Sequence, residues 1–426
     1  MKFIHAADIH LDSPLEGLER YEGAPVDLIR GATRRALENL VELALAERVD
    51  FVVIAGDLYD GDWRDFNTGM FFIRQMHKLC DAGIRLFLIA GNHDAANSMT
   101  RKLQLPTNPD GHGVMLSHDQ AETRRLEDLG VAIHGRSFAN QAEKQNMVPD
   151  YPMPLSNWFN LGILHTSLIG SDDGHDTYAP CSSTDLRSKG YDYWALGHIH
   201  KRSLLPVEGS PLVSPPFLYS GNIQGRHIRE PGSRGCFLVT VDQRHQTQIE
   251  FRPLDVFRWD VCLVSCVGCT TSEDVLERFR DSLRLLLAKH DRLPVGVRVR
   301  LEGATSVHQR LTSHRTAITA EMRSIATVVS DGQAWIEQVR IATQDPLEHA
   351  TPEVGDGPLV ELERYFDELP GNDLALTQLT DELKDLAKKL PAELMLPPDG
   401  LQLENPEWIR EIVRDLKPML MDRFNG

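Results

Sequence analysis

Cysteine is scarce in this chain of 426 residues, which has six of them at no regular spacing. A small secreted domain held together by disulfide bonds is therefore excluded, and a reducing compartment is the simpler assumption. No apolar run approaches the roughly 20 residues that span a bilayer, and the N-terminal residues resemble neither a signal peptide nor a transit peptide. We therefore expect a cytoplasmic protein without a membrane partner. A Gly-rich phosphate loop followed by Lys and Ser or Thr is also missing, so we expect any ATP motor to be a separate chain.

Basic side chains are outnumbered, with 45 Lys and Arg against 62 Asp and Glu and a formal net charge of −17. This balance excludes a protein that coats nucleic acid or an anionic membrane by bulk charge. The acidity is concentrated: residues 342–426 carry 19 acidic and 8 basic side chains, whereas residues 271–341 carry 9 and 11. An anionic substrate must therefore bind at a local site of positive charge that lies before residue 342 in the chain.

Short apolar runs alternate with helical patterns over the first 235 residues, which indicates a layered α/β domain that we place at residues 1–257. We expect helices at residues 27–48 and 67–81. The expected strands are residues 2–7, 51–55, 84–90, 161–164, 193–196, 216–220 and 236–241.

The rhythm changes after residue 257. A small α+β module is expected at residues 258–342, with strands at 261–267, 295–301 and 335–341 and helices at 272–288 and 307–325. The module is rich in arginine, and these side chains either contact DNA or lie on a solvated face. Cys266 and Cys269 form half of a zinc-ribbon pattern, which a strand followed by a turn explains as well.

A polar linker follows at residues 343–357, and residues 358–426 are typical of a helical tail. Helices are expected at residues 359–369, 374–390 and 406–424. The last has an apolar stripe that is either a core or a surface for a partner helix.

Five of the apolar runs are followed by side chains that bind metal ions. In chain order these are Asp8 and His10, Asp57, Asn92, His165, and His198 and His200. Ligands of open α/β sheets bind beyond the carboxyl ends of the strands, so we expect these residues to converge. Residues two apart in an extended backbone project to the same side, which favours the D-x-H and H-x-H pairs. Gly56, Gly91 and Gly197 are expected to let the backbone turn sharply as it leaves each strand.

The expected ligands are carboxylates, imidazoles and one amide, without a thiolate, which favours Mn²⁺, Fe²⁺ or Zn²⁺. Seven side chains are too many for one tetrahedral ion but suit two ions about 4 Å apart that share a carboxylate. Two divalent ions bring four positive charges, of which Asp8 and Asp57 neutralise two. The remaining surplus suits a phosphate.

The succession D-x-H, G-D-x-x-D, G-N-H-D, H and G-H-x-H, over about residues 1–200, resembles the calcineurin-like metallophosphoesterase superfamily. Within it, the segments IHAADIHLDSP, GDLYD, GNHD and YSGNIQGRHIRE resemble the SbcD-type DNA repair exonucleases, in particular the YhaO-like branch. Asp12, Ser13 and Pro14 stand where SbcD itself is expected to have a Gly-centred turn, which favours that branch. The resemblance implies a layered metallophosphoesterase β-sandwich flanked by helices, and the sequence pattern adds a small α+β capping or DNA-contact domain and a helical C-terminal tail.

The resemblance also implies roles for individual side chains. One ion is expected on Asp8, His10 and His200, and the other on Asn92, His165 and His198, with Asp57 bridging them. His93 is the expected catalyst that is not a ligand, and Asp94 is expected to orient it. A place behind the ligands or on the phosphate side is expected for Asp60, Asn222, Gln224, Arg226 and His227.

The function implied is that of a DNA nuclease, in particular an exonuclease, with two divalent ions, Mn²⁺ being favoured. It is expected to be a homodimer that works in DNA repair with an SMC-like ATPase subunit of the SbcC or YhaN type. The metal site alone also allows a metallophosphatase or a phosphodiesterase acting on a nucleotide or another small phosphoester. A third reading is a DNA-binding scaffold with a vestigial site, against which the intact ligand set counts.

Overall fold

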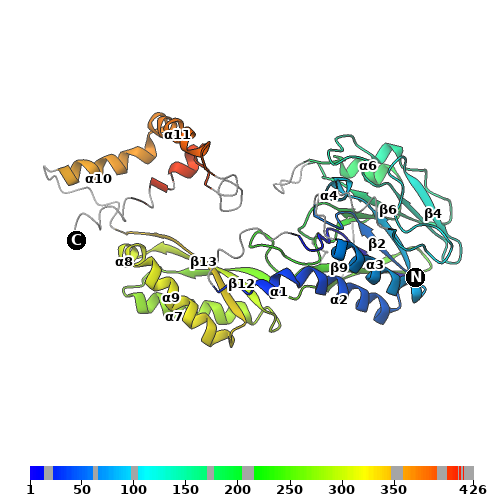
Figure 1. Cartoon of the computed structure of the whole chain (residues 1–426), viewed down its shortest axis with the longest axis horizontal. Helices are drawn as coiled ribbons and strands as arrows, with labels where there is room; N and C mark the ends of the chain where they lie inside the picture. The colour runs from blue at the N-terminus through cyan, green and yellow to red at the C-terminus, as the bar shows by residue number, and fades with distance from the viewer. Residues whose placement is uncertain are drawn as a thin grey trace. The chain divides into compact units, whose positions relative to one another are not determined.

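The structure, a computed structural model, describes residues 1–13, 23–60, 66–96, 104–169, 177–203, 215–346, 358–390, 401–410, 412–413 and 416. The chain divides into two compact units (Figure 1). The first comprises Met1–Asp260 with Leu293–Gly296, and the second Val261–Arg292 with Val297–Gly426. Among the described residues, no helix combines the length and the apolar character that a membrane crossing requires.

Two five-stranded sheets form the centre of the first unit. The first has the order β10-β9-β1-β2-β3, in which β1 (Lys2–Ala6), β2 (Phe51–Ala55) and β3 (Arg85–Ile89) are parallel, whereas β9 (Gly235–Val241) and β10 (Thr247–Pro253) continue it antiparallel. The second has the order β4-β5-β6-β7-β8, with β4 (Glu122–Leu126) antiparallel and β5 (Val131–Gly135), β6 (Phe159–His165), β7 (Tyr193–Gly197) and β8 (Phe217–Tyr219) parallel.

The two sheets pack face to face, because alternate residues of each strand are apolar on the inner side. Phe3, Phe51 and Phe87 of the first sheet share one core with Phe159 and Tyr193 of the second. The outer faces are covered by helices, α2 (Ala32–Glu47) and α3 (Phe66–Asp81) on the first sheet and α6 (Ser183–Ser188) on the second (Figure 1). The predicted α/β architecture, a sandwich of sheets flanked by helices, is confirmed.

Several predicted elements differ from those observed. The helix expected at residues 27–48 is two helices, α1 (Val26–Arg30) and α2, which meet at Gly31. The helix expected at residues 307–325 is α8 (His308–Ser313) followed by α9 (Arg315–Ser330). Strands β4, β5 and β10 were not predicted. The two outermost of these, β4 and β10, have few buried residues, so their sequences lack an apolar run.

Most of a three-stranded sheet of order β11-β12-β13 belongs to the second unit, together with helices that pack beside it. The strands are β11 (Arg258–Ser265), β12 (Val295–Ala304) and β13 (Ala334–Gln344). Helix α7 (Ser272–Leu287) packs on α9, and α9 packs on β13. The side chain of Thr271 caps α7 by accepting from the backbone N–H of Asp274.

Two arginines of this unit have structural partners instead of an open face for DNA. Arg298 is buried and makes two hydrogen bonds to the Glu337 carboxylate, at 2.9 and 2.7 Å. Arg278 donates to the backbone carbonyls of Ser265 and Val267. Cys266 and Cys269 are buried free thiols, and within the described ranges they belong to no group of three metal-binding side chains.

The tail contains α10 (Pro358–Glu368), the 3₁₀ turn η3 (Leu369–Gly371), α11 (Asp373–Ala387) and a helix that begins at residue 406. A small core joins them through Leu369, Leu376, Ile409 and Val413. Most of the helix predicted at residues 406–424 lies outside the described residues.

A buried polar contact links the two sheets of the first unit. The Nδ1 atom of His5 on β1 lies 3.0 Å from the hydroxyl of Tyr193 on β7, and its Nε2 lies 3.2 Å from the carbonyl of Leu196. Burial lowers the pKa of His5 to about 3, so the ring is neutral. Because the Leu196 carbonyl can only accept, Nε2 donates to it and Nδ1 accepts from Tyr193.

Replacing Tyr193 with phenylalanine should remove this donor and leave Nδ1 of His5 buried without a partner. A loss of about 1 to 3 kcal/mol of stability is expected. Hydrogen exchange of the β1 and β7 amides measures it. Tyr365→Phe, at a side chain that is 58% exposed, is the matched control and should change nothing by more than about 0.5 kcal/mol. Unchanged exchange in Tyr193→Phe would contradict the link.

Candidate metal centre

The two sheets approach each other closely where their parallel strands end. A Cβ atom on Gly197, at the end of β7, would lie 1.9 Å from the carbonyl oxygen of Ala55, at the end of β2. A Cβ on Gly91, after β3, would lie 2.3 Å from the Asp57 carboxylate. These two glycines therefore allow close approach, and our prediction that they serve sharp turns holds only for Gly56, whose φ is +94°.

The backbone around the expected ligands is left-handed, not extended. Asp8, His10, Asp57 and His198 have φ values of 50°, 43°, 53° and 102°. The predicted convergence is therefore correct, but the reason given for the D-x-H and H-x-H pairs is wrong. Hydrogen bonds from the backbone N–H of Asp8 to Gly56 and of His10 to Asp57, both 3.0 Å, hold the strained segment. Non-glycine residues in this region store strain that the surrounding structure must compensate, and such residues cluster at functional sites.

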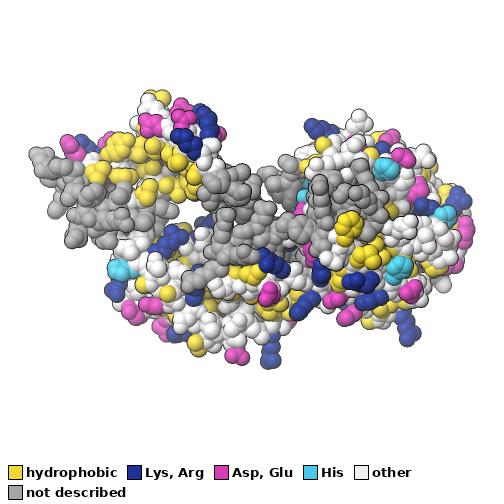
Figure 2. All heavy atoms as spheres, in the orientation of Figure 1, with side chains coloured by type: hydrophobic (Ala, Val, Ile, Leu, Met, Phe, Trp, Pro, Cys, Tyr) yellow, Lys and Arg dark blue, Asp and Glu magenta, His cyan; other side chains and the backbone are white. Residues whose placement is uncertain are grey.

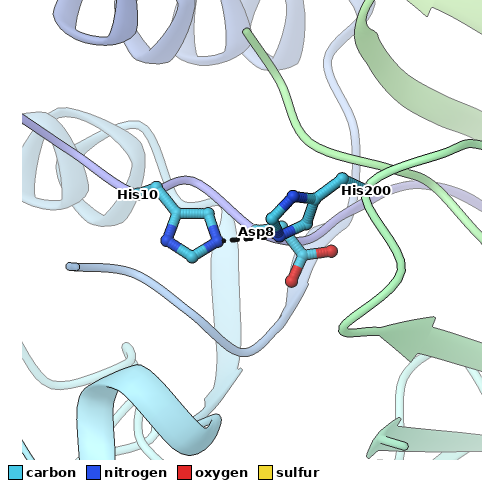
Figure 3. A group of neighbouring side chains, drawn as sticks. All are labelled: Asp8, His10 and His200. Carbon is cyan, nitrogen blue, oxygen red and sulfur yellow. Dashed lines mark hydrogen bonds between the residues drawn. The ribbon is translucent and has the colours of Figure 1, made fainter. Parts of the chain in front are cut away.

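Asp8, His10 and His200 form the first ligand group (Figure 3). Their ligand atoms lie within 4.8 Å of one another, and the two Nε2 atoms of the histidines are 3.1 Å apart. Nδ1 of His200 lies 2.7 Å from the Glu230 carboxylate, so it donates and leaves a lone pair on Nε2. Nδ1 of His10 is buried without a hydrogen-bond partner among the described residues.

A second group surrounds His165. Its Nδ1 donates to the carbonyl of Ala55 at 2.9 Å, so Nε2 is the nitrogen that faces the other side chains of the group. That atom lies 2.9 Å from the side-chain oxygen of Asn92 and 3.4 Å from the Asp57 carboxylate. The ring of His198 stands edge-on to that of His165, with ring centres 5.3 Å apart. All four side chains belong to residues that are buried.

The electrostatics of both groups call for cations. Burial, together with the charge of the Asp57 carboxylate, raises the pKa of Asp8 to about 7 although the charge of His165 opposes the rise. Burial alone would lower the pKa of His165, but the Asp57 and Asp8 carboxylates raise it to about 9. The carboxylates of Asp8 and Asp57 thus share one buried site, where neighbouring negative charges are costly unless cations compensate them. The donor set of carboxylate, imidazole and amide fits two divalent ions.

His93 lies at the rim of this cluster, beside Asp60. Its Nδ1 is 2.8 Å from the Asp60 carboxylate, and its side chain is 34% exposed. Burial alone would lower the pKa of His93, but the hydrogen bond to Asp60 and the charge of Asp57 raise it. The partner is not the predicted one: the buried carboxylate of Asp94 instead accepts from the backbone N–H groups of residues 58, 59 and 91. Asp94 braces the loops, and Asp60 orients His93.

The segment after β8 was expected behind the ligands or on the phosphate side. Asn222 and Gln224 are buried with their amides bonded inside the protein, and Asn222 donates to Glu230, which holds His200. Arg226 does reach the centre: its Nη1 atom lies 3.4 Å from the Asp60 carboxylate and its Nη2 atom 3.1 Å from the Glu230 carboxylate. The side chain of His227 is 45% exposed and lies 3.9 Å from Glu230.

Glu230 was not predicted as a site residue, although it is the carboxylate that holds His200. A signal was present: between residues 226 and 234 it is the single acid among Arg226, His227, Arg229 and Arg234. An isolated acid in a basic stretch indicates a paired, buried carboxylate.

Comparison with known proteins agrees with this geometry. Residues 1–202 match the family described as calcineurin-like phosphoesterase, and residues 259–344 match the middle domain of metallophosphoesterase YhaO. The uncharacterized metallophosphoesterase YhaO of Bacillus subtilis is 33% identical over 306 residues, which cover 71% of this chain and 72% of that protein.

Two DNA double-strand break repair proteins Mre11 are also similar. That of Methanopyrus kandleri is 25% identical over 308 residues, covering 66% of this chain and 62% of its own. That of Aeropyrum pernix is 36% identical over 254 residues, covering 54% and 56%. The chain therefore spans less than two thirds of the length of either Mre11 protein.

Mn²⁺ added to protein stripped with EDTA should raise the melting temperature, because ions between the buried ligands stabilise only the folded state. At a free concentration 100-fold above Kd, one site contributes about 2.7 kcal/mol. Differential scanning calorimetry measures the shift. Asp57→Asn should reduce it strongly, whereas Asp128→Asn, at an exposed carboxylate paired with Arg85, should not. An equal shift in both variants would mean that Mn²⁺ binds elsewhere.

Proposed function

The chain belongs to the calcineurin-like metallophosphoesterases, phosphoester hydrolases that use a dinuclear divalent metal site, and from that premise we propose that it is a Mn²⁺-dependent DNA nuclease. The observation that carries the proposal is the meeting of two buried ligand groups with an accessible His93 at the ends of five strands. The similarity to Mre11 proteins, named for DNA double-strand break repair, supports DNA as the substrate. Exonuclease action in DNA repair is the specific form proposed.

In this proposal one ion is held by Asp8, His10 and His200. The other is held by Asn92, His165 and His198, with Asp57 between the two. When bound, the two ions supply Lewis acidity at the phosphoryl group and lower the pKa of water. The contacts among these side chains and their burial support the assignment.

His93 is the proposed general acid. Its Nδ1 is engaged by Asp60 at 2.8 Å, so its Nε2 is the atom that can give a proton to the leaving oxygen. The backbone N–H of His93 donates to Asp57 at 3.1 Å, which ties the acid to the ligand proposed to bridge the ions. Arg226, at 12% side-chain exposure, is the proposed contact to a substrate phosphate.

Incubation with Mn²⁺ should yield cleavage of linear or single-stranded DNA, and His93→Ala should lower the rate about 10²- to 10⁴-fold while retaining metal. A gel assay with a fluorescent oligonucleotide measures the rate, and metal content is measured in parallel. The matched control is His118→Ala, at a histidine 63% exposed, which should leave the rate unchanged.

A panel of nucleotide and phosphomonoester substrates decides the competing function. Turnover of these compounds faster than DNA would establish a metallophosphatase or small phosphodiesterase instead. Intact DNA in every assay, with and without the ATPase partner, would refute the nuclease proposal.

The tail is the proposed contact for an SMC-like ATPase of the SbcC or YhaN type. Figure 2 shows hydrophobic side chains gathered over α10 and α11. Tyr365, Leu374 and Leu386 on these helices are 58%, 72% and 48% exposed, and such patches mark interaction surfaces. We also propose a homodimer, on the family resemblance, and a cytoplasmic location, which the six free thiols support.

Deletion of residues 358–426 should spare Mn²⁺-dependent hydrolysis and abolish association with the ATPase, because the exposed apolar helices are lost while the ligand groups remain. Size-exclusion chromatography of the mixed subunits measures association. Leu374→Asp tests the surface without truncation and should weaken binding. Co-elution of the truncated chain with the ATPase would refute the assignment.

A further inference from the structure

Glu230 receives four hydrogen bonds although it is only 4% exposed. One oxygen, Oε1, lies 2.7 Å from Nδ1 of His200 and 3.1 Å from Nη2 of Arg226. The other, Oε2, accepts from the backbone N–H of Arg226 and from the amide of Asn222, both at 2.8 Å. Both carboxylate oxygens are therefore fully engaged, and the segment from 222 to 230 is folded around this one side chain.

The bond to His200 decides which ring nitrogen can bind a metal. An ionised carboxylate has only lone pairs to offer, so Nδ1 of His200 must carry the proton when the other ring nitrogen binds a metal ion. The Nη2 atom of Arg226 is also 3.2 Å from Nδ1 of His200. Because a guanidinium only donates hydrogen bonds, Nη2 donates to Glu230 and not to the protonated Nδ1. The lone pair of His200 is thus fixed on Nε2, the atom that faces His10.

The same carboxylate holds Arg226 from two sides, through its backbone and its guanidinium. The other terminal nitrogen of that guanidinium, Nη1, lies 3.4 Å from the Asp60 carboxylate and 3.5 Å from the Ser13 hydroxyl. Asp60 in turn holds His93. Two of the four bonds of Glu230 close its own loop, and the other two point toward the site. If Glu230 served only to hold its own loop together, the bonds to His200 and to the Arg226 guanidinium would not be needed.

We propose that Glu230 is a positioning residue that prepares His200 to coordinate through Nε2 and, with the same carboxylate, places Arg226 on the substrate side. The inference rests on the proposed dinuclear centre and deepens it by naming the residue that links metal loading to phosphate binding. Hydrogen-bond partners of metal-binding histidines fix the ring and its tautomer, and their loss costs about 10- to 100-fold in metal affinity.

Glu230→Gln keeps the shape of the side chain but turns an NH₂ group toward donors that need an acceptor. The full-length variant should bind one Mn²⁺ about 10- to 100-fold more weakly and the other as the wild type does. Calorimetric titration measures both affinities, and electron paramagnetic resonance should show isolated Mn²⁺ where the wild type shows a coupled pair. Glu122→Gln is the matched control, since Glu122 also accepts from a backbone N–H and from an arginine.

A double-mutant cycle with His200→Ala separates positioning from general destabilisation. If Glu230 acts on this ion through His200, Glu230→Gln should add no further loss of metal affinity in the His200→Ala chain. Additive losses, or unchanged affinity in Glu230→Gln alone, would overturn the inference. A wild type that binds fewer than two ions would instead overturn the proposed dinuclear centre.

Two further measurements test the inference if the Glu230→Gln variant does not fold. Glu230→Asp keeps the charge but withdraws the carboxylate, and the same cycle applies with a loss confined to the same ion. Nitrogen-15 NMR of the wild-type protein reads the His200 tautomer directly. A proton on Nδ1 is expected, and a proton on Nε2 with a bare Nδ1 would overturn the inference.

Discussion

The burial of two carboxylates, Asp8 and Asp57, at the joint of two sheets is the constraint on which the site depends. Both are at most 1% exposed, and an uncompensated buried charge is among the most expensive features a protein can carry. Backbone N–H groups stabilise the two charges in part: that of His198 donates to Asp8, and that of His93 donates to Asp57. Neighbouring imidazoles meet another part, and the remainder is suited to cations. The surrounding fold keeps these acceptors together although they repel one another.

The expected ligands come from the two sheets in separate sets. Asp8, His10, Asp57 and Asn92 follow strands of the first sheet, whereas His165, His198 and His200 end or follow strands of the second. Neither sheet alone builds either ligand group. The face-to-face core of aromatic side chains and the His5–Tyr193 contact therefore serve the site as well as stability, because they set the position of one half against the other.

The convergence of the expected ligands could be predicted because each of them follows a buried apolar run, a pattern visible without tertiary information. What failed depends on contacts between distant segments. The left-handed turn at His10 is stabilised by a bond to the backbone of Asp57, and Gly197 is required by a carbonyl that lies more than 100 residues earlier. The place of Asn222 was left open in the sequence because a polar residue near a motif can lie behind the ligands or on the substrate side. Its burial decides between them.

The hydrogen bond from His198 to Asp8 spans 190 positions of the chain. Contacts of such separation form late in folding, since the loop between them must close before they contribute. We therefore expect the centre to assemble after both sheets have docked, so that ions bound there would stabilise the native state more than the transition state that precedes it. Metal occupancy would then act on how long a folded molecule survives, through a slower unfolding rate, and hardly on how fast a new chain folds.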